Sequence, residues 1–472
     1  MKLLIEVWGN YHAWKEVAYT YGNKTIISST TLPLLLDSIK PDTSIIIVAD
    51  TLLEEEIAKN KITFDNNNNA YDSICSTVRD RTQQFINRSL ANFEVKDFAN
   101  SISVLVTPAV GTFSHTRFNG NPHNFFSYLY YSLAKTAATI AQKTHEPLEI
   151  YVDITHGINY MTMMTYRAIK DICSVLAYFL DITFIVLNSD PYVGSENKNL
   201  NINQIEKTKI KPQFNFFKYP QFDNGRWLKV THNMPNEKKA QVNATLQEQL
   251  KECFTLTSFV DQCYCFASAV YNALPLFLVY FLPDIKMLTE TIDNFVNIFF
   301  DNISIYHDDK LTVQQQADFT PSFVSLLQIL LFAQCCKYKY NIEKQDQCNI
   351  STLHNLIKLY SSFSAFKSRI YRELSKIGEA IQQSSLPLST YEDYGKILYE
   401  KNKKCETSDT EEEKKYKPSD TVDERNLFAH AGLTYNNIQI KREGDAIFIK
   451  PKKESIDDIK KVLQNNIPTG LE

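Results

Sequence analysis

The sequence predicts two kinds of fold in one chain: an α/β domain with a doubly wound sheet and, after it, an all-α domain. Over the first 190 residues, short and almost continuously apolar runs alternate with longer amphipathic stretches. Such runs are typical of parallel strands that helices cover on both faces. After about residue 240 the apolar side chains recur at helical spacing almost throughout. This half of the chain is therefore expected to form a helical bundle.

Residues 1–190 are expected to form the α/β domain. In a doubly wound sheet, ligands bind beyond the carboxyl ends of the strands. The loops that follow the predicted strands are therefore the first candidates for a binding site. The strands are predicted at 3–8, 44–49, 101–107, 148–153 and 182–187, and the two longest helices at 123–144 and 158–179.

Residues 191–243 are expected to form a connector that holds a small β or winged element, because this stretch is polar, aromatic and punctuated by proline. Residues 244–472 form the predicted helical domain. We expect a charged loop at 401–418, which carries six lysines and five acidic residues, and a β-hairpin that turns near Glu443 to Asp445 before a last helix. The other helices are predicted at 244–281, 285–300, 322–336, 352–383 and 390–402.

The composition excludes several classes of protein. Lys and Arg number 50 against 54 Asp and Glu, a net charge of −4, whereas domains that coat long nucleic acids carry a clear basic excess. The nine cysteines form no C-x-x-C pair, which disfavours the usual zinc and redox spacings and fits a reducing compartment. No apolar stretch approaches the length of about 18 residues that a membrane span needs. We predict a cytoplasmic protein that contacts no membrane.

Several common catalytic signatures are missing from the chain. No two of its 12 glycines are spaced G-x-G, and the sequence contains no P-loop, G-x-S-x-G or H-E-x-x-H motif. A dinucleotide cofactor, ATP hydrolysis, a serine nucleophile and zincin chemistry are therefore not expected. No metal site is predicted either.

The segment DITHGINY follows a predicted strand and precedes a predicted helix. Asp153, Thr155 and His156 leave the carboxyl edge of the sheet, Gly157 permits a sharp turn, and Asn159 lies in the first helical turn. Backbone N–H groups at such a position, together with the helix dipole, suit a phosphate group. The structural alternative is that Asp153 and Thr155 only cap the helix while Gly157 serves the turn.

Two further loops support a ligand site at the same edge. The first predicted strand ends in Gly9 and Asn10, and a third strand is followed by the polar, Gly-bearing loop 107–120. In a doubly wound sheet these loops can share one edge. Three such loops predict a pocket for a phosphorylated ligand.

The segment DERNLFAHAGL near the end of the chain contains Arg425, Asn426 and His430. RNA can be cut without a metal when its 2′-OH attacks the adjacent phosphorus, because the nucleophile is already tethered. A histidine can transfer the protons, and an arginine can hold the phosphate oxygens. Such cleavage normally uses two histidines, which a two-fold dimer would supply. The structural alternative is a surface arginine and a helix-end histidine before Gly432.

The joint occurrence of D-x-T-H-G-x-N in the α/β half and R-N-x-x-x-H near the end of the helical half resembles the CARF-HEPN ancillary ribonucleases of type III CRISPR systems. This resemblance covers both halves in the right order. It implies a Rossmann-like CARF sensor domain followed by an all-α HEPN nuclease domain. The long connector and the charged loop before Arg425 depart from a minimal two-domain plan.

The resemblance also implies roles for particular residues. Arg425 and His430 would be catalytic, with Asn426 at the neighbouring position that is commonly polar in the family. The residues expected to approach a cyclic oligoadenylate are Gly9, Asn10, Asp153, Thr155, His156, Gly157, Ile158 and Asn159.

Single-stranded RNA is the expected substrate, because unstacked strands reach in-line geometry and duplexes do not. The resemblance further implies cleavage without a metal or another cofactor, leaving 2′,3′-cyclic phosphate ends. The expected allosteric activator is a cyclic oligoadenylate, with cyclic tetra-adenylate the first choice, and the expected assembly is a homodimer or a higher homo-oligomer. Two other hypotheses remain open at this stage. One is a ligand-responsive transcription regulator that has the sensor but no nuclease activity, and the other is a non-catalytic binding module.

Overall fold

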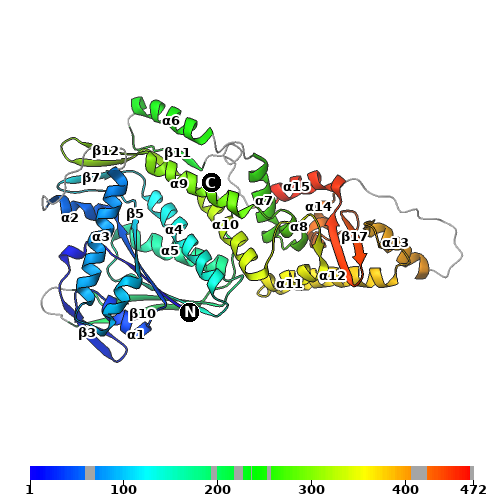
Figure 1. Cartoon of the computed structure of the whole chain (residues 1–472), viewed down its shortest axis with the longest axis horizontal. Coiled ribbons are helices and arrows are strands. Elements are labelled where there is room, and N and C mark those ends of the chain that lie inside the picture. Colours follow the sequence, from blue (N-terminus) through cyan, green and yellow to red (C-terminus); the bar gives the residue numbers. More distant parts are fainter. Residues whose placement is uncertain are drawn as a thin grey trace. The chain divides into compact units, whose positions relative to one another are not determined.

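A computed structural model describes residues 1–58, 70–192, 199–216, 227–234, 236–251, 257–405 and 422–467. The chain forms two compact units, and both are discontinuous in sequence (Figure 1). The predicted domains, 1–190 and 244–472, are continuous, so the packing differs from that expectation. Unit 1 comprises Met1–Gln213, Arg226–Cys253 and Glu290–Leu327, and unit 2 comprises Phe214–Gly225, Phe254–Thr289 and Gln328–Glu472.

Unit 1 is built on an eight-stranded sheet with the order β3-β2-β10-β9-β8-β1-β4-β5. The five neighbouring strands β5, β4, β1, β8 and β9 are parallel. They correspond to the five predicted strands. The strand bounds are β1 (Lys2–Val7), β2 (Val17–Tyr21), β3 (Lys24–Ser28), β4 (Thr43–Ala49), β5 (Ile102–Thr107), β8 (Leu148–Asp153), β9 (Ile182–Ser189) and β10 (Asn199–Lys209).

The chain changes the side of the sheet to which it adds parallel strands between β1 and β8. From β1 the chain proceeds to β4 and β5 on one side, whereas β8 and β9 lie on the other side. In open α/β sheets, ligands usually bind beyond the carboxyl ends of the strands at such a reversal, because the connections leave in opposite directions. We call the region formed by the loops after β1 and β8 the crevice. The loops after β1 and β8 are the two in which the sequence predicts ligand-binding residues.

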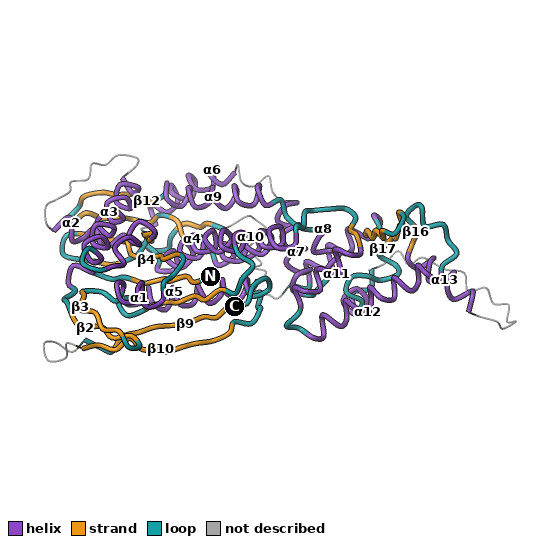
Figure 2. Tube along the Cα trace, turned by 60° about the horizontal axis from the view of Figure 1, so that its bottom comes forward, coloured by secondary structure: helices purple, strands orange, loops and turns teal. Residues whose placement is uncertain are grey.

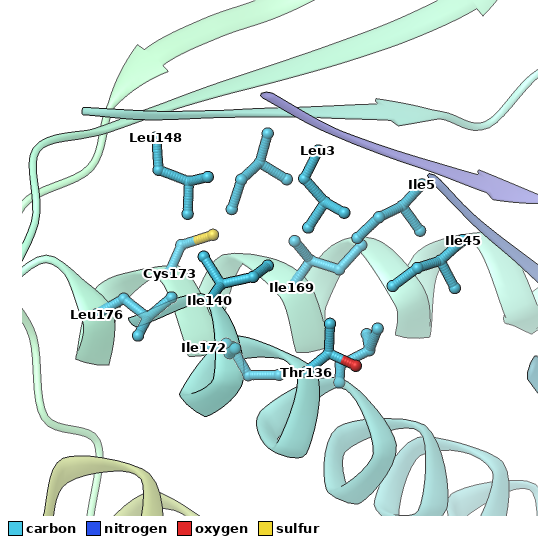
Figure 3. A pocket seen from close by; sticks show the side chains of 13 residues that line it. Leu3, Ile5, Ile45, Thr136, Ile140, Leu148, Ile169, Ile172, Cys173 and Leu176 are labelled. Carbon is cyan, nitrogen blue, oxygen red and sulfur yellow. The ribbon is translucent and has the colours of Figure 1, made fainter. Parts of the chain in front are cut away.

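The helices α4 (Pro122–Lys143) and α5 (Asn159–Leu176) pack on one face of the sheet (Figure 3). Between them and the strands lies a small apolar cavity whose lining includes Leu3 and Leu148 at the beginning of β1 and β8. The cavity therefore lies toward the amino ends of the strands, away from the crevice. The other helices of the N-terminal part are α1 (Leu32–Ile39), α2 (Leu53–Ala58) and α3 (Ala70–Leu90).

The connector predicted at 191–243 contributes a full strand to the main sheet. β10 is antiparallel to β9 and runs beside it along its length (Figure 2). Most of its side chains are exposed, so it lacks the continuous apolar run of the buried strands. This explains why the sequence analysis did not detect it. Residues 193–198 and 217–226 of the connector lie outside the described part of the chain.

Residues 290–327 belong to unit 1 and contain three strands, although the sequence predicted helices almost throughout this half of the chain. β13 pairs in parallel with β7, and β14 pairs with β11. These pairings are why residues 290–327 belong to unit 1. The elements are β6 (Gly111–Thr112), β7 (Thr116–Asn119), β11 (Leu228–Val230), α6 (Asn236–Lys251), β12 (Ile303–His307), β13 (Leu311–Gln315) and β14 (Ala317–Phe319).

Unit 2 is mainly helical and contains the predicted hairpin, in which β17 pairs with β18, followed by the predicted last helix. Most of the predicted charged loop, residues 406–418, lies outside the described residues, and 401–405 end a helix instead. The bounds are α7 (Thr257–Tyr271), α8 (Pro275–Tyr280), α9 (Ile285–Asp301), α10 (Pro321–Tyr340), β15 (Cys348–Asn349), α11 (Ile350–Leu356), α12 (Ser364–Gln383), β16 (Glu392–Asp393), α13 (Tyr394–Cys405), α14 (Glu424–Ala429), β17 (Ile438–Glu443), β18 (Ala446–Pro451) and α15 (Ile456–Asn465). α9 and α10 each contribute residues to both units.

Candidate functional sites

The loops after β1 and β8 are joined directly. The Gly9 N–H donates a hydrogen bond to the carbonyl of His156 over 2.8 Å. A Cβ atom at Gly9 would lie 2.7 Å from Ile158 Cγ2, and one at Gly157 would lie 2.2 Å from Thr162 Oγ1. A side chain at either position would therefore force Ile158 or Thr162 to move, which favours glycine at both. The structure thus brings together two loops that are far apart in the sequence.

Asp153 organises the loop after β8. Its carboxyl group is buried and accepts hydrogen bonds from Thr31 Oγ1 at 2.6 Å and from Thr155, through N at 3.0 Å and Oγ1 at 2.5 Å. Thr155 Oγ1 in turn accepts a hydrogen bond from Ser189 N at 3.0 Å. Burial raises the pKa of Asp153, although these hydrogen bonds oppose the rise. The Asp153 carboxyl group therefore fixes the conformation of the loop after β8. Because it is buried, it is hardly accessible to a ligand.

Glu6 is a second buried carboxyl group beneath the crevice, and the sequence analysis did not single it out. It stands opposite Asp153 in the β1–β8 register, and its Oε2 accepts a hydrogen bond from Trp8 Nε1 at 2.8 Å. Burial, and then the nearby charge of Asp153, raise the pKa of Glu6 well above its ordinary value. Glu6 therefore anchors Trp8, and the Trp8 ring lies edge-on to Trp14 at a centroid distance of 5.4 Å.

His156 is held in its neutral form. Its ring stacks on Trp14 with centroids 4.0 Å apart, and Nε2 lies 3.4 Å from the Thr31 backbone N–H, which can only donate. Tyr19 approaches the same nitrogen at 3.5 Å. Burial lowers the pKa of His156 to about 3. The Tyr19 ring lies edge-on to the same imidazole at a centroid distance of 5.9 Å, so the neutral imidazole is part of an aromatic cluster at this edge of the sheet.

The exposed part of this site is formed by Asn10, Ile158 and Asn159. Asn10 Nδ2 donates to Glu55 Oε1 at 2.9 Å, so its side chain is directed to Glu55 and not to the loop after β8. Asn159 has a positive φ of 49° at the first residue of α5, an 18-residue helix. The amino end of α5 therefore opens directly at the crevice, where its dipole favours an anion.

The third predicted loop, 107–120, is fastened to the same edge of the sheet. Val110 N donates to Tyr160 Oη at 3.1 Å, and Ala109 N donates to Asp50 Oδ1 at 2.9 Å. Tyr71 Oη donates to the other oxygen of Asp50 at 3.0 Å. Burial raises the pKa of Asp50 to about 7 in spite of these hydrogen bonds. Tyr160 lies in the first turn of α5, which places this loop beside the crevice.

The residues of the R-N-x-x-x-H motif lie on α14 and immediately after it, within unit 2. Asp423 caps this short helix by accepting a hydrogen bond from Asn426 N at 2.8 Å. Leu427 is buried and anchors the helix, whereas Arg425 and Asn426 are exposed. His430 follows the last helical residue, and 37% of its side chain is exposed. The motif therefore places a cation, an amide and an imidazole on an accessible surface.

A buried carboxylate, Glu373 on α12, holds His430. Its Oε2 lies 3.0 Å from His430 Nδ1, and its Oε1 accepts hydrogen bonds from Arg372 Nε at 3.0 Å and Lys376 Nζ at 3.1 Å. Burial on its own raises the pKa of Glu373, but the hydrogen bonds from His430, Arg372 and Lys376 outweigh it, so the pKa lies below its ordinary value. Glu373 is therefore ionised near neutral pH.

Sequence reasoning did not find Glu373, although a signal was present. Within α12, Glu373 lies on the buried stripe together with Ile370, Leu374 and Ile377. A charged residue on an apolar stripe is rarely buried unless it is paired. The neighbouring Arg372 and Lys376 supply part of that pairing, but the link to His430, 57 residues later, depends on the fold.

Two kinds of feature are absent from the part of the chain that the structure describes. In that part of the chain, no three His, Cys, Asp or Glu side chains gather in a way that could hold a metal ion. No described helix combines the length and the apolar character needed to cross a membrane.

Comparison with known proteins relates both sites to characterised domains. A family model of the CARF domain of the CRISPR system endoribonuclease Csx1 matches residues 3–191, which include the crevice. A family model of the HEPN domain of the same enzyme matches residues 363–453, which include both Glu373 and His430. The CRISPR system endoribonuclease Csx1 of Methanocaldococcus jannaschii is 30% identical over 362 residues, covering 73% of this chain and 70% of that relative.

Proposed function

This chain belongs to the Csx1 family of CRISPR-system endoribonucleases and is an endoribonuclease with a CARF and a HEPN domain; from this premise we propose how it is activated and how it cuts. The activator is a cyclic oligoadenylate, with cyclic tetra-adenylate the first candidate. The substrate is single-stranded RNA, cleaved without a metal ion or another cofactor. The setting is antiviral defence by a type III CRISPR system in the cytoplasm.

The cleavage site comprises Arg425, Asn426 and His430. His430 transfers protons during attack of the 2′-OH on the adjacent phosphorus, and Arg425 holds the non-bridging oxygens. Asn426 adds a further hydrogen bond. The observation that carries this assignment is that all three residues lie on or directly after α14, within the segment similar to a HEPN domain, with His430 partly exposed.

Single-stranded RNA is the expected substrate because an unstacked strand can reach the in-line geometry that 2′-OH attack requires. One copy of the motif offers one histidine, whereas this reaction usually employs an acid and a base. A homodimer with two-fold symmetry, or a higher homo-oligomer built from it, brings two copies together.

The activator site is the crevice between the loops after β1 and β8. Asn10, Ile158 and Asn159 offer exposed surface, and His156 lies beside Ile158 in the same loop, stacked on Trp14. Gly9 and Gly157 allow the close approach of the two loops, and Asp153 and Thr155 hold the second loop in place. Activation requires that the ligand bind the cutting-competent arrangement more tightly than the inactive one.

The decisive assay uses a fluorescent single-stranded RNA in the presence of EDTA. Wild type and His430→Ala are compared without ligand, with cyclic tetra-adenylate and with cyclic hexa-adenylate. Cleavage by wild type alone, and with one ring size alone, is the expected result. Cleavage of a matching DNA strand would contradict the mechanism, because DNA has no 2′-OH. Membership of an endoribonuclease family disfavours the alternative of a transcription regulator without nuclease activity.

A further inference from the structure

Glu373 combines features that a surface ion pair does not have. Only 5% of its side chain is exposed, yet both of its oxygens are engaged, one by His430 and the other by Arg372 and Lys376. Burying a charge is costly unless hydrogen bonds and partners compensate it. The two cations lie on the same helix and account for Oε1, so they leave Oε2 for the imidazole.

The contact determines which nitrogen of His430 carries a proton. A carboxylate can only accept hydrogen bonds, so the 3.0 Å contact requires a proton on Nδ1. When the ring is neutral, Nε2 then carries the lone pair. Nε2 is also the nitrogen that is free of the carboxylate and belongs to a side chain that is partly exposed.

We propose that Glu373 is a positioning residue for the ribonuclease reaction, which holds His430 with Nδ1 protonated so that Nε2 exchanges protons with the RNA. This inference rests on the proposed role of His430. Glu373 does not touch the RNA and acts through the imidazole alone. Its carboxylate also stabilises the positive charge that appears on His430 whenever Nε2 takes up a proton.

Arg372 and Lys376 complete the arrangement. A protonated Glu373 could donate a hydrogen bond to Nδ1 and would then favour the opposite tautomer, with the lone pair on the wrong nitrogen. The two cations hold Glu373 in its ionised form by binding Oε1. The RELSK segment of α12 therefore contributes a charge, and not only packing, to the site 57 residues away.

The test compares Glu373→Gln with wild type and with Glu379→Gln. Gln has nearly the shape of Glu but is neutral and can either donate to Nδ1 or accept from it. Glu379 lies on the same helix with 63% of its side chain exposed, so it is the matched control. We expect kcat to fall roughly 100-fold in Glu373→Gln with KM little changed, and to stay within about twofold of wild type in Glu379→Gln.

A second measurement does not depend on activity. Nitrogen-15 NMR of histidine-labelled protein reports the tautomer of His430, identified by its absence in His430→Ala. We expect a protonated Nδ1 in wild type and a mixture of tautomers in Glu373→Gln. Glu373→Asp keeps the charge on a shorter side chain, and we expect its kcat to lie between those of wild type and Glu373→Gln.

Two results would overturn the role of Glu373: unchanged kcat in Glu373→Gln, or a wild-type His430 whose proton lies on Nε2. If Glu373 had a purely structural role, Glu373→Asp would have a kcat no higher than that of Glu373→Gln, because Asp fits the space of Glu less well than Gln does. Failure of the proposed function is distinguishable, because His430→Ala would then still cut RNA while the NMR result continued to report on Glu373.

Discussion

His156 in unit 1 and His430 in unit 2 are the same residue type in opposite environments. His156 stacks on Trp14, and its Nε2 faces a backbone N–H. Burial lowers its pKa to about 3, so it is neutral at any physiological pH. His430 is partly exposed, and its Nδ1 faces a buried carboxylate. The first environment suppresses the charged form of the imidazole, whereas the second places an ionised carboxylate against one ring nitrogen of a partly exposed side chain.

The difference separates binding from proton transfer within one molecule. An imidazole that never titrates can serve as a flat surface and a fixed hydrogen-bond partner, but it cannot exchange protons with a substrate. An imidazole held by a carboxylate can take up a proton and release it again. We therefore expect changes at His430 to alter the rate of cleavage, and changes around His156 to alter the response to the activator.

The largest expected effect is the loss of cleavage in His430→Ala. Removing the imidazole removes the proton transfer, and we expect the rate to fall by about 10³-fold with the activator affinity unchanged. Single-turnover cleavage of a labelled RNA and calorimetric titration of the activator measure the two quantities. If His430→Ala lost activator affinity as strongly as cleavage rate, binding and proton transfer would not be separate functions of the two sites.

A smaller effect is expected from Trp14→Ala, which removes the ring on which His156 stacks. Loss of one aromatic stacking partner corresponds to roughly a tenfold weaker binding of the activator. The rate without activator should not change. Tyr192→Ala, which alters a half-exposed aromatic residue of unit 1, is the control. If Trp14→Ala bound cyclic tetra-adenylate as tightly as wild type, the stack would have no part in recognition.

The depressed pKa of His156 predicts how stability depends on pH. The unfolded chain binds a proton at this residue below about pH 6.5, whereas the folded chain does not until about pH 3. Folding is therefore progressively disfavoured as the pH falls from 6.5 toward 3. His156→Phe keeps a flat ring and removes the proton site, so its thermal midpoint should decline less than that of wild type between pH 6.5 and 4.

Asp50, beside the loop 107–120, is expected to make stability depend on pH in the opposite direction to His156. This is the smallest of the expected effects. Its pKa of about 7 in the folded chain exceeds its ordinary value of 3.8, so the folded chain binds the extra proton between these values. Its contribution to stability is therefore lost as the pH rises toward 7 and beyond. Asp50→Asn should raise the thermal midpoint at pH 8 by a few degrees relative to wild type, and by less at pH 5. An equal shift at both values would contradict the assignment.

The sequence predicted the parts of unit 1 whose signal is local. β1, β4 and β9 are buried almost throughout, and β5 and β8 are buried in large part, so each contains an apolar run that can be recognised by itself. β10 and the strands β12 to β14 were missed for different reasons. Most side chains of β10 are exposed and β14 has three residues, whereas β13 is buried but carries Thr and Gln in place of a continuous apolar run. These strands are defined by the partners they pair with.

The same distinction applies to the two sites. The loop 153–159 and the R-N-x-x-x-H motif are contiguous in sequence, so their residue types could be read together. Trp14, Tyr19 and Thr31 reach His156 from the segment after β1, from the β2–β3 hairpin and from the start of α1. Glu373 reaches His430 from another helix. Contacts between distant segments leave no local pattern, and for this reason they could not be predicted.

The return of residues 290–327 to unit 1 constrains how the protein matures during its synthesis. Arg117 on β7 forms an ion pair with Asp309, 192 residues later, beside the pairing of β7 with β13. At translation rates of about 5 to 20 residues per second, a ribosome needs roughly 10 to 40 s to cover that interval. During this time the edge of β7 that later pairs with β13 has no strand beside it and is open to pairing with other chains. The sensor can thus be completed only after most of the polypeptide has emerged.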